Sequence, residues 1–314
     1  MTSAKPDPTT LDQSFEFDNA THHYHIKWCS LGNSNNPPLV FVHGTPWSSR
    51  VWKPFALALS RQYHVYLFDN PGFGESPLEV QLHGNSFQED SEVTRLDADL
   101  ARQSEVFAAL YKSWSKDWAG RKAHVVAHDH AGLMSLRAYL LHDCEFASLC
   151  LIDVVAIGPF GQSLFKSIAD NPQVFQDLPD MAFDGILESY IRNAAFKDLS
   201  PHVMEMLKAP WVKEGGKSGF IRQLCQANSR STEEVEGRYG VVGEQIPVKV
   251  IWGTQDKWIP VETASRLGHA LKAKIVVQIE DAGHLIMYDE PVALAVELTG
   301  WLDSVAPTTP RVRR

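Results

Sequence analysis

Short apolar segments alternate with longer amphipathic ones along most of the chain. Buried-strand patterns, apolar runs closed by turn residues, occur at 39–43, 63–69, 123–128, 148–155, 248–253 and 274–280. Helical spacing of apolar positions occurs at 50–60, 97–114, 133–142, 261–272 and 291–303. Strands that alternate with helices of this length imply right-handed βαβ crossovers. The sequence therefore predicts an α/β fold with a mostly parallel, doubly wound sheet.

The alternation stops between residues 159 and 245, where no good strand pattern occurs. The segment is helical and rich in large apolar side chains, among them Phe165, Phe183 and Trp211. It is either an insertion that completes the core or a cap over the carboxyl edge of the sheet, where open α/β sheets bind ligands. We favour the cap. The predicted organisation is a polar tail at 1–20, a core at 21–158 and 246–305, a helical cap at 159–245, and a second tail at 306–314.

Bulk composition narrows the classes of partner. The 314 residues are 44% hydrophobic and 21% charged, which is ordinary for a globular protein. The net charge of −9 argues against a general nucleic-acid or anionic-membrane binder. No apolar run reaches the length of a membrane span, roughly 18 residues. We therefore expect a small molecule as the partner, and the sequence leaves a homodimer open.

Cysteine usage and the start of the chain bear on location and cofactors. The first ten residues, MTSAKPDPTT, contain no apolar stretch, so the sequence predicts no secretory leader. The four cysteines have no metal-ligand spacing and are typical of buried thiols in a reducing compartment. We expect a cytoplasmic protein without a metal or other cofactor.

The stretch VVAHDHAGL, residues 125–133, places a carboxylate at a tight turn between a predicted strand and a predicted helix. Small residues at Ala127, Ala131 and Gly132 let the strand and helix approach closely, and this forces the side chain of Asp129 out above the sheet. This is the pattern of a nucleophile elbow, whose central residue is usually Ser. The alternative is that Asp129 only caps the helix, a common use of Asp. We favour the elbow.

With this motif the chain resembles the α/β-hydrolase family, from about residue 22 to 303. The His-Gly-Thr-Pro run at 43–46 resembles the family's oxyanion loop. Asp256, in IWGTQDKWIP, and His284, in EDAGHLIMYDEP, fall where the triad acid and histidine of the family belong. The chain order of nucleophile, acid and histidine also matches. The resemblance implies an α/β-hydrolase fold in which Asp129, Asp256 and His284 form the catalytic set.

The roles of several neighbouring residues follow from the same resemblance. The backbone N–H groups of Thr45 and His130 would hold an oxyanion. Asp153, at the end of the strand pattern at 148–155, is a rival triad acid because some Asp-nucleophile relatives place the acid there; we favour Asp256. We expect His128 to pack beneath the elbow, and the role of the His130 imidazole is left open.

A carboxylate nucleophile restricts the chemistry. It is ionised at neutral pH and needs no base to attack. Attack on an ester or amide would give a labile anhydride, whereas attack on a saturated carbon gives an alkyl ester on Asp129. Water activated by His284 could then hydrolyse that ester, with the oxyanion held by backbone N–H groups. Within the resembled family this implies an epoxide hydrolase or a haloalkane or haloacetate dehalogenase.

The residues around the leaving group favour the epoxide hydrolase. Tyr190 resembles the first of two cap tyrosines in epoxide hydrolases, although Ile221 stands where the second is usual and Tyr239 is a candidate replacement. Trp47 and Trp211 are candidate halide or substrate contacts, but the Trp and Asn usual in haloalkane dehalogenases are replaced by His130 and Thr45. A dehalogenase is the second hypothesis. An esterase, a C–C bond hydrolase and a non-catalytic binder are further alternatives.

Overall fold

The computed structural model describes residues 7–82, 99–160, 163–225 and 229–306. A single sheet runs through the molecule in the order β1-β2-β4-β3-β6-β7-β8-β9, with β5 paired to β2. At one edge, β2 His22–Leu31 pairs antiparallel with β1 Gln13–Asp18, with β5 Val80–Gln81 and with the neighbouring strand β4. The strands that pair in parallel are β3 Pro38–Val42, β4 His64–Phe68, β6 Ala123–His128, β7 Phe146–Ile152, β8 Val248–Gly253 and β9 Ile275–Ile279. The fold is therefore α/β with a mostly parallel sheet, as predicted.

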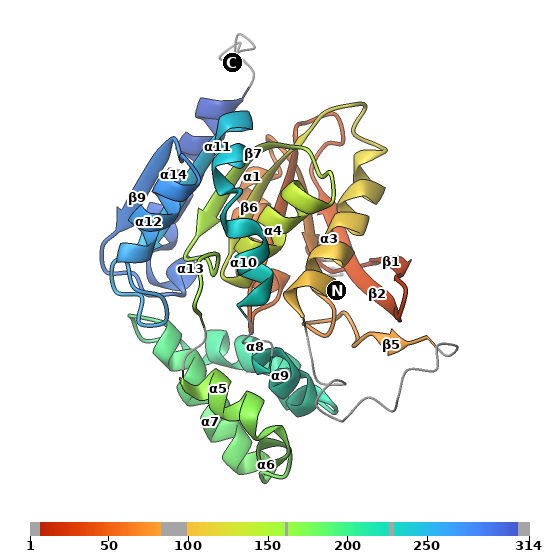
Figure 1. Ribbon diagram of the computed structural model, residues 1–314, viewed down its shortest axis with the longest axis vertical. Helices are drawn as coiled ribbons and strands as arrows, with labels where there is room; N and C mark the ends of the chain where they lie inside the picture. Colours follow the sequence, from red (N-terminus) through yellow and green to blue (C-terminus); the bar gives the residue numbers. More distant parts are fainter. Residues whose placement is uncertain (1–6, 83–98, 161–162, 226–228, 307–314) are drawn as a thin grey trace, which may run out of the picture.

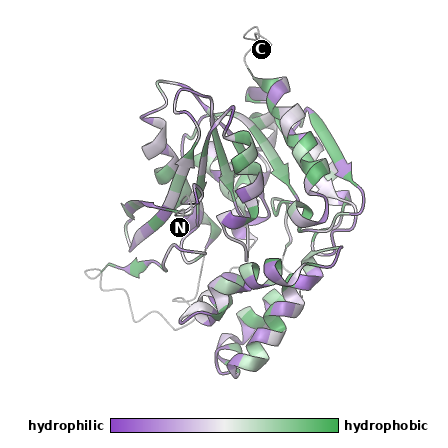
Figure 2. Ribbon diagram, turned by 180° about the vertical axis from the view of Figure 1, so that it is seen from behind, coloured by the Kyte–Doolittle hydropathy of each residue, from purple (hydrophilic) through white to green (hydrophobic). Residues whose placement is uncertain are grey.

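Helices cover both faces of this sheet (Figure 1). One face packs against the 3-10 helix η1 Ser49–Trp52, α1 Lys53–Leu59 and α14 Pro291–Val305. The opposite face packs against α3 Leu100–Ser115, α4 His130–Leu141 and α12 Glu262–Ala270. Every residue of β3, β6 and β8 is buried because both faces are covered. Figure 2 shows these central strands as mostly hydrophobic.

Five helices form a separate cap at one end of the molecule, beyond the carboxyl edge of the sheet (Figure 1). They are α5 Ser163–Asp170, α6 Pro172–Gln176, α7 Asp180–Ala194, α8 Pro201–Val212 and α9 Gly216–Leu224. Apolar side chains from these helices join the same buried cluster as α1 and α14. The cap and the core thus share one continuous apolar interior.

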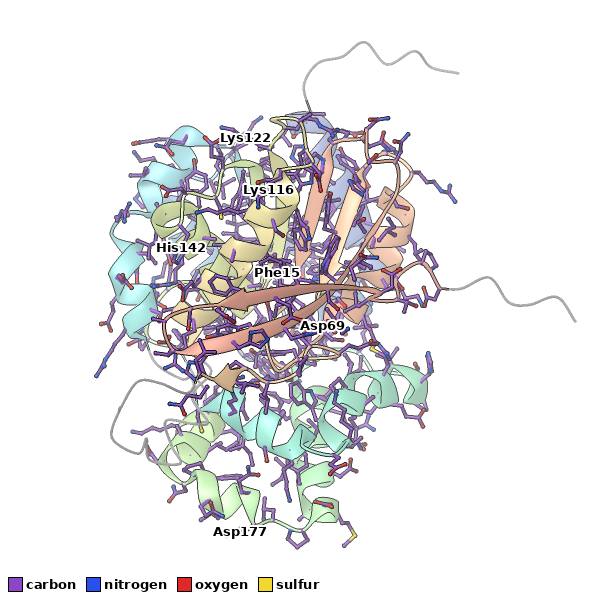
Figure 3. The ribbon with its side chains drawn as sticks, turned by 90° about the vertical axis from the view of Figure 1, so that its right-hand side faces the viewer. Phe15, Asp69, Lys116, Lys122, His142 and Asp177 are labelled. Atoms are coloured by element: carbon purple, nitrogen blue, oxygen red, sulfur yellow. The ribbon has the colours of Figure 1, made fainter. Side chains whose placement is uncertain are left out.

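The boundaries differ from the sequence prediction at two places. Helices α10 Arg230–Glu236 and α11 Tyr239–Gln245 pack on α4 and belong to the core, so the cap ends before them rather than at 245. Strand β1 lies inside the predicted polar tail. Its apolar Phe15 (labelled in Figure 3) and Phe17 alternate with polar residues and pack against the core, which is the pattern of an edge strand with one covered face.

Candidate active site

Asp129 occupies a strained turn between β6 and α4. Its backbone has φ 57° and ψ −131°, and positive φ is uncommon for a residue other than glycine. Two neighbouring glycines make room for the turn. A Cβ on Gly132 would lie 2.4 Å from Val154 Cβ, and a Cβ on Gly44 would lie 2.3 Å from Asp129 Cβ. The predicted elbow is therefore present in the structure, with the carboxylate at its apex.

The loop at 43–46 wraps around this carboxylate. The backbone N–H of Thr45 donates to Asp129 Oδ1 at 2.7 Å. His43 fixes the loop, because its Nε2 accepts the N–H of Asn70 at 2.9 Å while its Nδ1 faces the Gly44 carbonyl at 3.0 Å. The Asp129 oxygen held by Thr45 is the one that would carry the negative charge if the side chain became an ester under attack.

His130 and Trp211 support the same loop from two sides. Nδ1 of the His130 ring lies 3.0 Å from the hydroxyl oxygen of Thr45. The indole N–H of Trp211, from cap helix α8, donates to the Pro46 carbonyl at 2.9 Å. Because its donor is used in this way, Trp211 holds the loop in place and does not offer a free donor to a substrate.

His284 lies between two carboxylates. Its Nδ1 is 2.8 Å from Asp256 Oδ2, and its Nε2 is 3.2 Å from Asp129 Oδ2. The other oxygen of Asp256 accepts the backbone N–H groups of Trp258 at 2.7 Å and Ile259 at 3.0 Å. The structure thus brings together the three residues that the sequence predicts as a catalytic set. The Asp256 carboxylate orients the histidine, and the remaining ring nitrogen faces Asp129.

The electrostatics of this group are those of a buried ion pair. Burial alone would raise the pKa of Asp129, but His130 and His284 lower it below its ordinary value. Burial alone would lower the pKa of His284, but the carboxylates of Asp256 and Asp129 raise it well above its ordinary value. The resting site therefore pairs an ionised Asp129 with a protonated His284.

His128 lies beneath the elbow, at the end of β6. Its Nε2 donates to the backbone carbonyl of His284 at 2.8 Å, and burial lowers the pKa of its ring to about 3. The side chain is fully buried. A neutral imidazole that bonds the histidine loop from below is the packing role that the sequence predicts for this residue.

Asp153 is fully buried at the end of β7, with a positive φ of 45°. Its Oδ1 accepts the N–H of Gly253 at 2.8 Å, while its Oδ2 has no hydrogen-bond partner among the described residues. Burial, reinforced by the charge of Asp256, raises its pKa well above the ordinary value. Asp153 is therefore a protonated acid, and the carboxylate that accepts the hydrogen bond of His284 is Asp256.

A second carboxylate, Asp289, fastens the cap to the histidine loop. Its Oδ2 accepts the N–H groups of Phe196 at 2.9 Å and Gly283 at 2.8 Å, and its Oδ1 accepts that of Lys197 at 2.8 Å. Gly283 directly precedes His284, while Phe196 and Lys197 follow the end of cap helix α7. No sequence signal marks this residue, because an acid two positions before a helix-starting proline does not indicate such distant partners.

Tyr190 projects from α7 into the buried region above the core. Its ring stacks on that of Trp258 with centroids 4.4 Å apart, and its buried hydroxyl has no partner among the described residues. Burial, with a further contribution from the charge of Asp129, raises the pKa of this phenol well above its ordinary value. Trp47 stacks on the same indole at 5.9 Å, and its buried N–H also has no partner in the described chain.

Tyr239 lies elsewhere. It begins α11 and is fully buried on the opposite face of the sheet, where its hydroxyl donates to the Ala156 carbonyl at 2.6 Å. Like Tyr190, Trp47 and Trp211, it is not among the residues that line the cavity above Asp129. The sequence prediction that Tyr239 contacts substrate is wrong, because α11 packs on α4 rather than in the cap.

A cavity of about 370 Å³ opens above Asp129 and His130. Most of its lining is apolar, from Val154, Ile157, Phe160, Phe165, Trp258 and Ile259. A largely apolar cavity with a few polar groups at one end is typical of small-molecule sites. Trp258 was not predicted as a site residue, although it stands two residues after Asp256 in the IWGTQDKWIP motif.

No group of three or more His, Cys, Asp or Glu side chains in the described ranges is arranged to hold a metal ion. Likewise, in the described part of the chain no helix combines the length and apolar character that a bilayer crossing requires.

Known proteins match this chain over most of its length. The sequence profile of the alpha/beta hydrolase family matches residues 39–298. The crystal structure of an alpha/beta hydrolase fold protein from Burkholderia ambifaria superimposes with a TM-score of 0.80 at 32% identity, covering 92% of this chain and 97% of that one.

Curated relatives carry several different names. The acetyltransferase component of the acetoin cleaving system of Pseudomonas putida is 27% identical over 277 residues, 84% of this chain. This chain spans only 63% of that relative. Haloalkane dehalogenase 2 of Mycobacterium bovis is 23% identical over 301 residues, covering 93% of this chain and 96% of the relative. Lipases, a methyl ester esterase and an epoxide hydrolase are also similar.

Proposed function

The chain belongs to the alpha/beta hydrolase family, and on this premise we propose that it hydrolyses an alkyl electrophile, an epoxide, through a covalent ester on Asp129. One observation carries the proposal: the apex of the elbow is a carboxylate, held at one oxygen by the Thr45 N–H and faced at the other by His284. The relatives' names include both ester and alkyl-electrophile hydrolases, so the choice rests on the chemistry of this site.

The nucleophile excludes the usual ester chemistry. Asp129 is ionised at any moderate pH, since its pKa lies below the ordinary value. Its attack on an ester carbonyl would form an anhydride, which is less stable than the starting ester. Its attack on a strained or halogenated carbon forms a simple ester, an intermediate that the oxyanion loop is arranged to hydrolyse.

In the first step, Asp129 Oδ2 attacks an epoxide carbon and the C–O bond of the ring breaks. The ring oxygen becomes an alkoxide and takes a proton from the Tyr190 hydroxyl. This hydroxyl suits the role because it is buried, has no competing partner among the described residues, and stays protonated at neutral pH. Esterification also removes the negative charge of Asp129, which lowers the pKa of the phenol at the moment it must donate.

Ester formation lowers the pKa of His284, which then releases the proton it carries in the resting site, and this proton restores Tyr190. In the second step, the neutral His284 takes a proton from water, and the resulting hydroxide adds to the ester carbonyl of Asp129. The oxyanion forms on Oδ1, which already accepts the Thr45 N–H; the N–H of His130, at the start of α4, is the second donor. Collapse expels the alcohol oxygen of the diol, which takes the proton from His284. The regenerated Asp129 acid ionises, and its proton returns to His284, which restores the resting ion pair.

The same ion pair sets the order of these steps. In the resting site the charge of Asp129 helps to hold the pKa of His284 well above its ordinary value, so the histidine is not a base. Ester formation neutralises Asp129 and leaves Asp256 as the one acidic partner in contact with His284 in the described site. The pKa of His284 then falls, and the histidine becomes able to deprotonate water once the ester exists.

A dehalogenase is the second candidate, and the indole N–H of Trp47 favours it. This donor is buried without a partner in the described chain, next to Trp258, and a departing halide needs N–H donors rather than a proton. Three other buried tryptophans, Trp52, Trp114 and Trp301, also have N–H groups with no partner among the described residues, so this observation is weaker than the unpartnered hydroxyl of Tyr190.

The proposal is tested by measuring product formation from styrene oxide, 1,2-epoxyhexane, 1-bromohexane and 4-nitrophenyl butyrate with wild-type protein and Asp129→Ala. We expect diols from the epoxides and loss of all turnover in the variant, with an unchanged circular-dichroism spectrum because Asp129 fills no core space. Turnover of the nitrophenyl ester alone, or epoxide hydrolysis that survives in the variant, would refute it.

A further inference from the structure

The cavity above Asp129 has different chemistry at its two ends. Its inner end is formed by Asp129 and His130, both buried. Its walls are apolar, and its outer end is formed by Thr263 and Arg266, which stand one turn of α12 apart. Arg266 is exposed, which places it at the mouth.

The guanidinium of Arg266 is not used by the fold. Among the described residues no carboxylate lies within ion-pair distance of it, although Glu262 stands four positions earlier on the same helix. Asp129 is the one acidic side chain among the described residues that line the cavity. Glu236 is not part of the lining, and its carboxylate accepts the backbone N–H of the lining residue Gly158 at 3.5 Å. A positive charge therefore stands at the mouth, separated by an apolar passage from the negative charge at the base.

We propose that the cavity takes substrates with a carboxylate at the end opposite the electrophilic carbon, and that Arg266 binds this carboxylate. This inference rests on the proposed function, since it assumes that Asp129 is the reacting end. An anionic group is not stable in the apolar passage, so the uncharged electrophile enters first. The planar guanidinium matches a carboxylate through two parallel hydrogen bonds.

The positive charge of Arg266 also offsets the repulsion between the protein and an anionic substrate. The chain has a net charge of −9, and the site itself is built on a carboxylate, so an anionic substrate is repelled as it approaches. A neutral epoxide would gain nothing from a cation at the mouth. A substrate with an acid group, an apolar middle and a terminal epoxide complements all three zones of the cavity.

The binding test uses an unreactive pair, 4-phenylbutyrate and 4-phenylbutyramide, titrated calorimetrically into three forms of the full-length protein. These are wild type, Arg266→Gln and the control Arg61→Gln, which removes an exposed arginine beyond α1 with the same change in charge. We expect wild type and Arg61→Gln to prefer the acid, and Arg266→Gln to lose about tenfold in affinity for the acid alone, the low end for a charged hydrogen bond because the site is wet. Equal affinities of wild type for acid and amide, no binding of the acid at millimolar concentration, or an equal loss of both ligands in Arg266→Gln would overturn the proposal.

A second measurement separates this proposal from the proposed function. The rate of adduct formation on His284→Gln is compared for 6,7-epoxyheptanoate and its amide, with and without Arg266→Gln. If the ratio of the adduct-formation rate of the acid to that of the amide falls about tenfold with Arg266→Gln, the binding of the carboxylate by Arg266 is supported. If the rate of adduct formation depends neither on the acid group nor on Arg266, the binding of a carboxylate by Arg266 is refuted, whereas the proposed function is supported. If calorimetry shows a preference for the acid but no adduct forms, the binding of a carboxylate by Arg266 is supported and ester formation on Asp129 is refuted.

Discussion

The ring of Tyr190 stacks on the indole of Trp258, with centroids 4.4 Å apart and an interplanar angle of 29°. Tyr190 comes from cap helix α7 and Trp258 from the loop after β8, so the stack joins the cap to the core. Trp258 also lies 4.8 Å from the ring of His284, and its backbone N–H donates to Asp256. A single aromatic stack therefore orients the cap phenol, the histidine and its acid together.

Tyr190→Phe should separate the two chemical steps. In the proposed mechanism the phenol protonates the opening epoxide, and losing one donor of this kind costs about 100- to 1,000-fold in rate. We expect that loss in formation of the Asp129 ester, and nearly unchanged hydrolysis of ester already formed, because the second step depends on His284. Rapid-quench single turnovers with an epoxide measure both rates. Equal losses in both steps, or no loss, would assign Tyr190 to packing alone.

Asp256→Asn should cost far more activity than Asp153→Asn. The Asp256 carboxylate bonds His284 at 2.8 Å, and replacing a triad acid by its amide lowers turnover by about 10⁴-fold in a well-studied triad. Asp153 is already a neutral acid because burial raises its pKa, so its amide is a close substitute and we expect less than about a threefold change. Steady-state rates of the two variants decide this, and the reverse order would move the triad acid to Asp153.

The two steps should respond differently to pH. Asp129 is ionised well below neutrality because its pKa is lowered, so ester formation should change little between pH 5 and pH 8. In the proposed mechanism hydrolysis needs neutral His284, and the pKa of this histidine falls when ester formation removes the charge of Asp129, so the rate of hydrolysis should rise with pH. We expect hydrolysis to be about 10- to 100-fold slower at pH 5 than at pH 8, with ester accumulating at pH 5. Acid-quenched mass spectra that show no ester at pH 5 would contradict this order of events.

Gly44→Ala should disable the site from the oxyanion loop. The new Cβ would lie 2.3 Å from Asp129 Cβ and 2.6 Å from its Oδ1, so the loop or the carboxylate must move. Displacements of about 1 Å at a reacting group cost on the order of 100-fold. Gly185→Ala is the control, because the exposed Gly185 of α7 has nothing within 4 Å of an added Cβ. We expect it to keep full activity and to gain about 0.5–1 kcal/mol in stability; similar activity in the two variants would contradict the account.

The fold and the central site were predictable from sequence because their signals are local. The elbow at 125–133 and the strand-end positions of Asp256 and His284 each occupy a few consecutive residues. The errors involve distant contacts or weak patterns. Helices α10 and α11 have apolar faces that suit a cap or a core equally, so Tyr239 was assigned to the wrong place. Strand β1 shows only Phe15 and Phe17 as apolar residues, since an edge strand needs one covered face.

Other features of the site depend on contacts that no periodicity records. Asp289 binds backbone N–H groups more than 90 positions away, at Phe196 and Lys197. The stack of Tyr190 on Trp258 and the place of Arg266 at the cavity mouth likewise exist only once the cap is folded over the core. Residues of this kind determine specificity, which is why the sequence alone indicated the reaction class but not the form of the substrate.

The central claim is that Asp129 forms a covalent ester, and intact mass spectrometry of His284→Gln tests it most directly. Without the histidine base the second step stops, so the ester should accumulate. After incubation with styrene oxide or 1,2-epoxyhexane, we expect a mass increase equal to the whole epoxide, located on the peptide that contains Asp129 and missing in the double variant Asp129→Ala, His284→Gln. With 1-bromohexane an increase equal to the hexyl group would indicate a halide as the leaving group. No adduct from any of these compounds, or an adduct that persists in the double variant, would contradict the account.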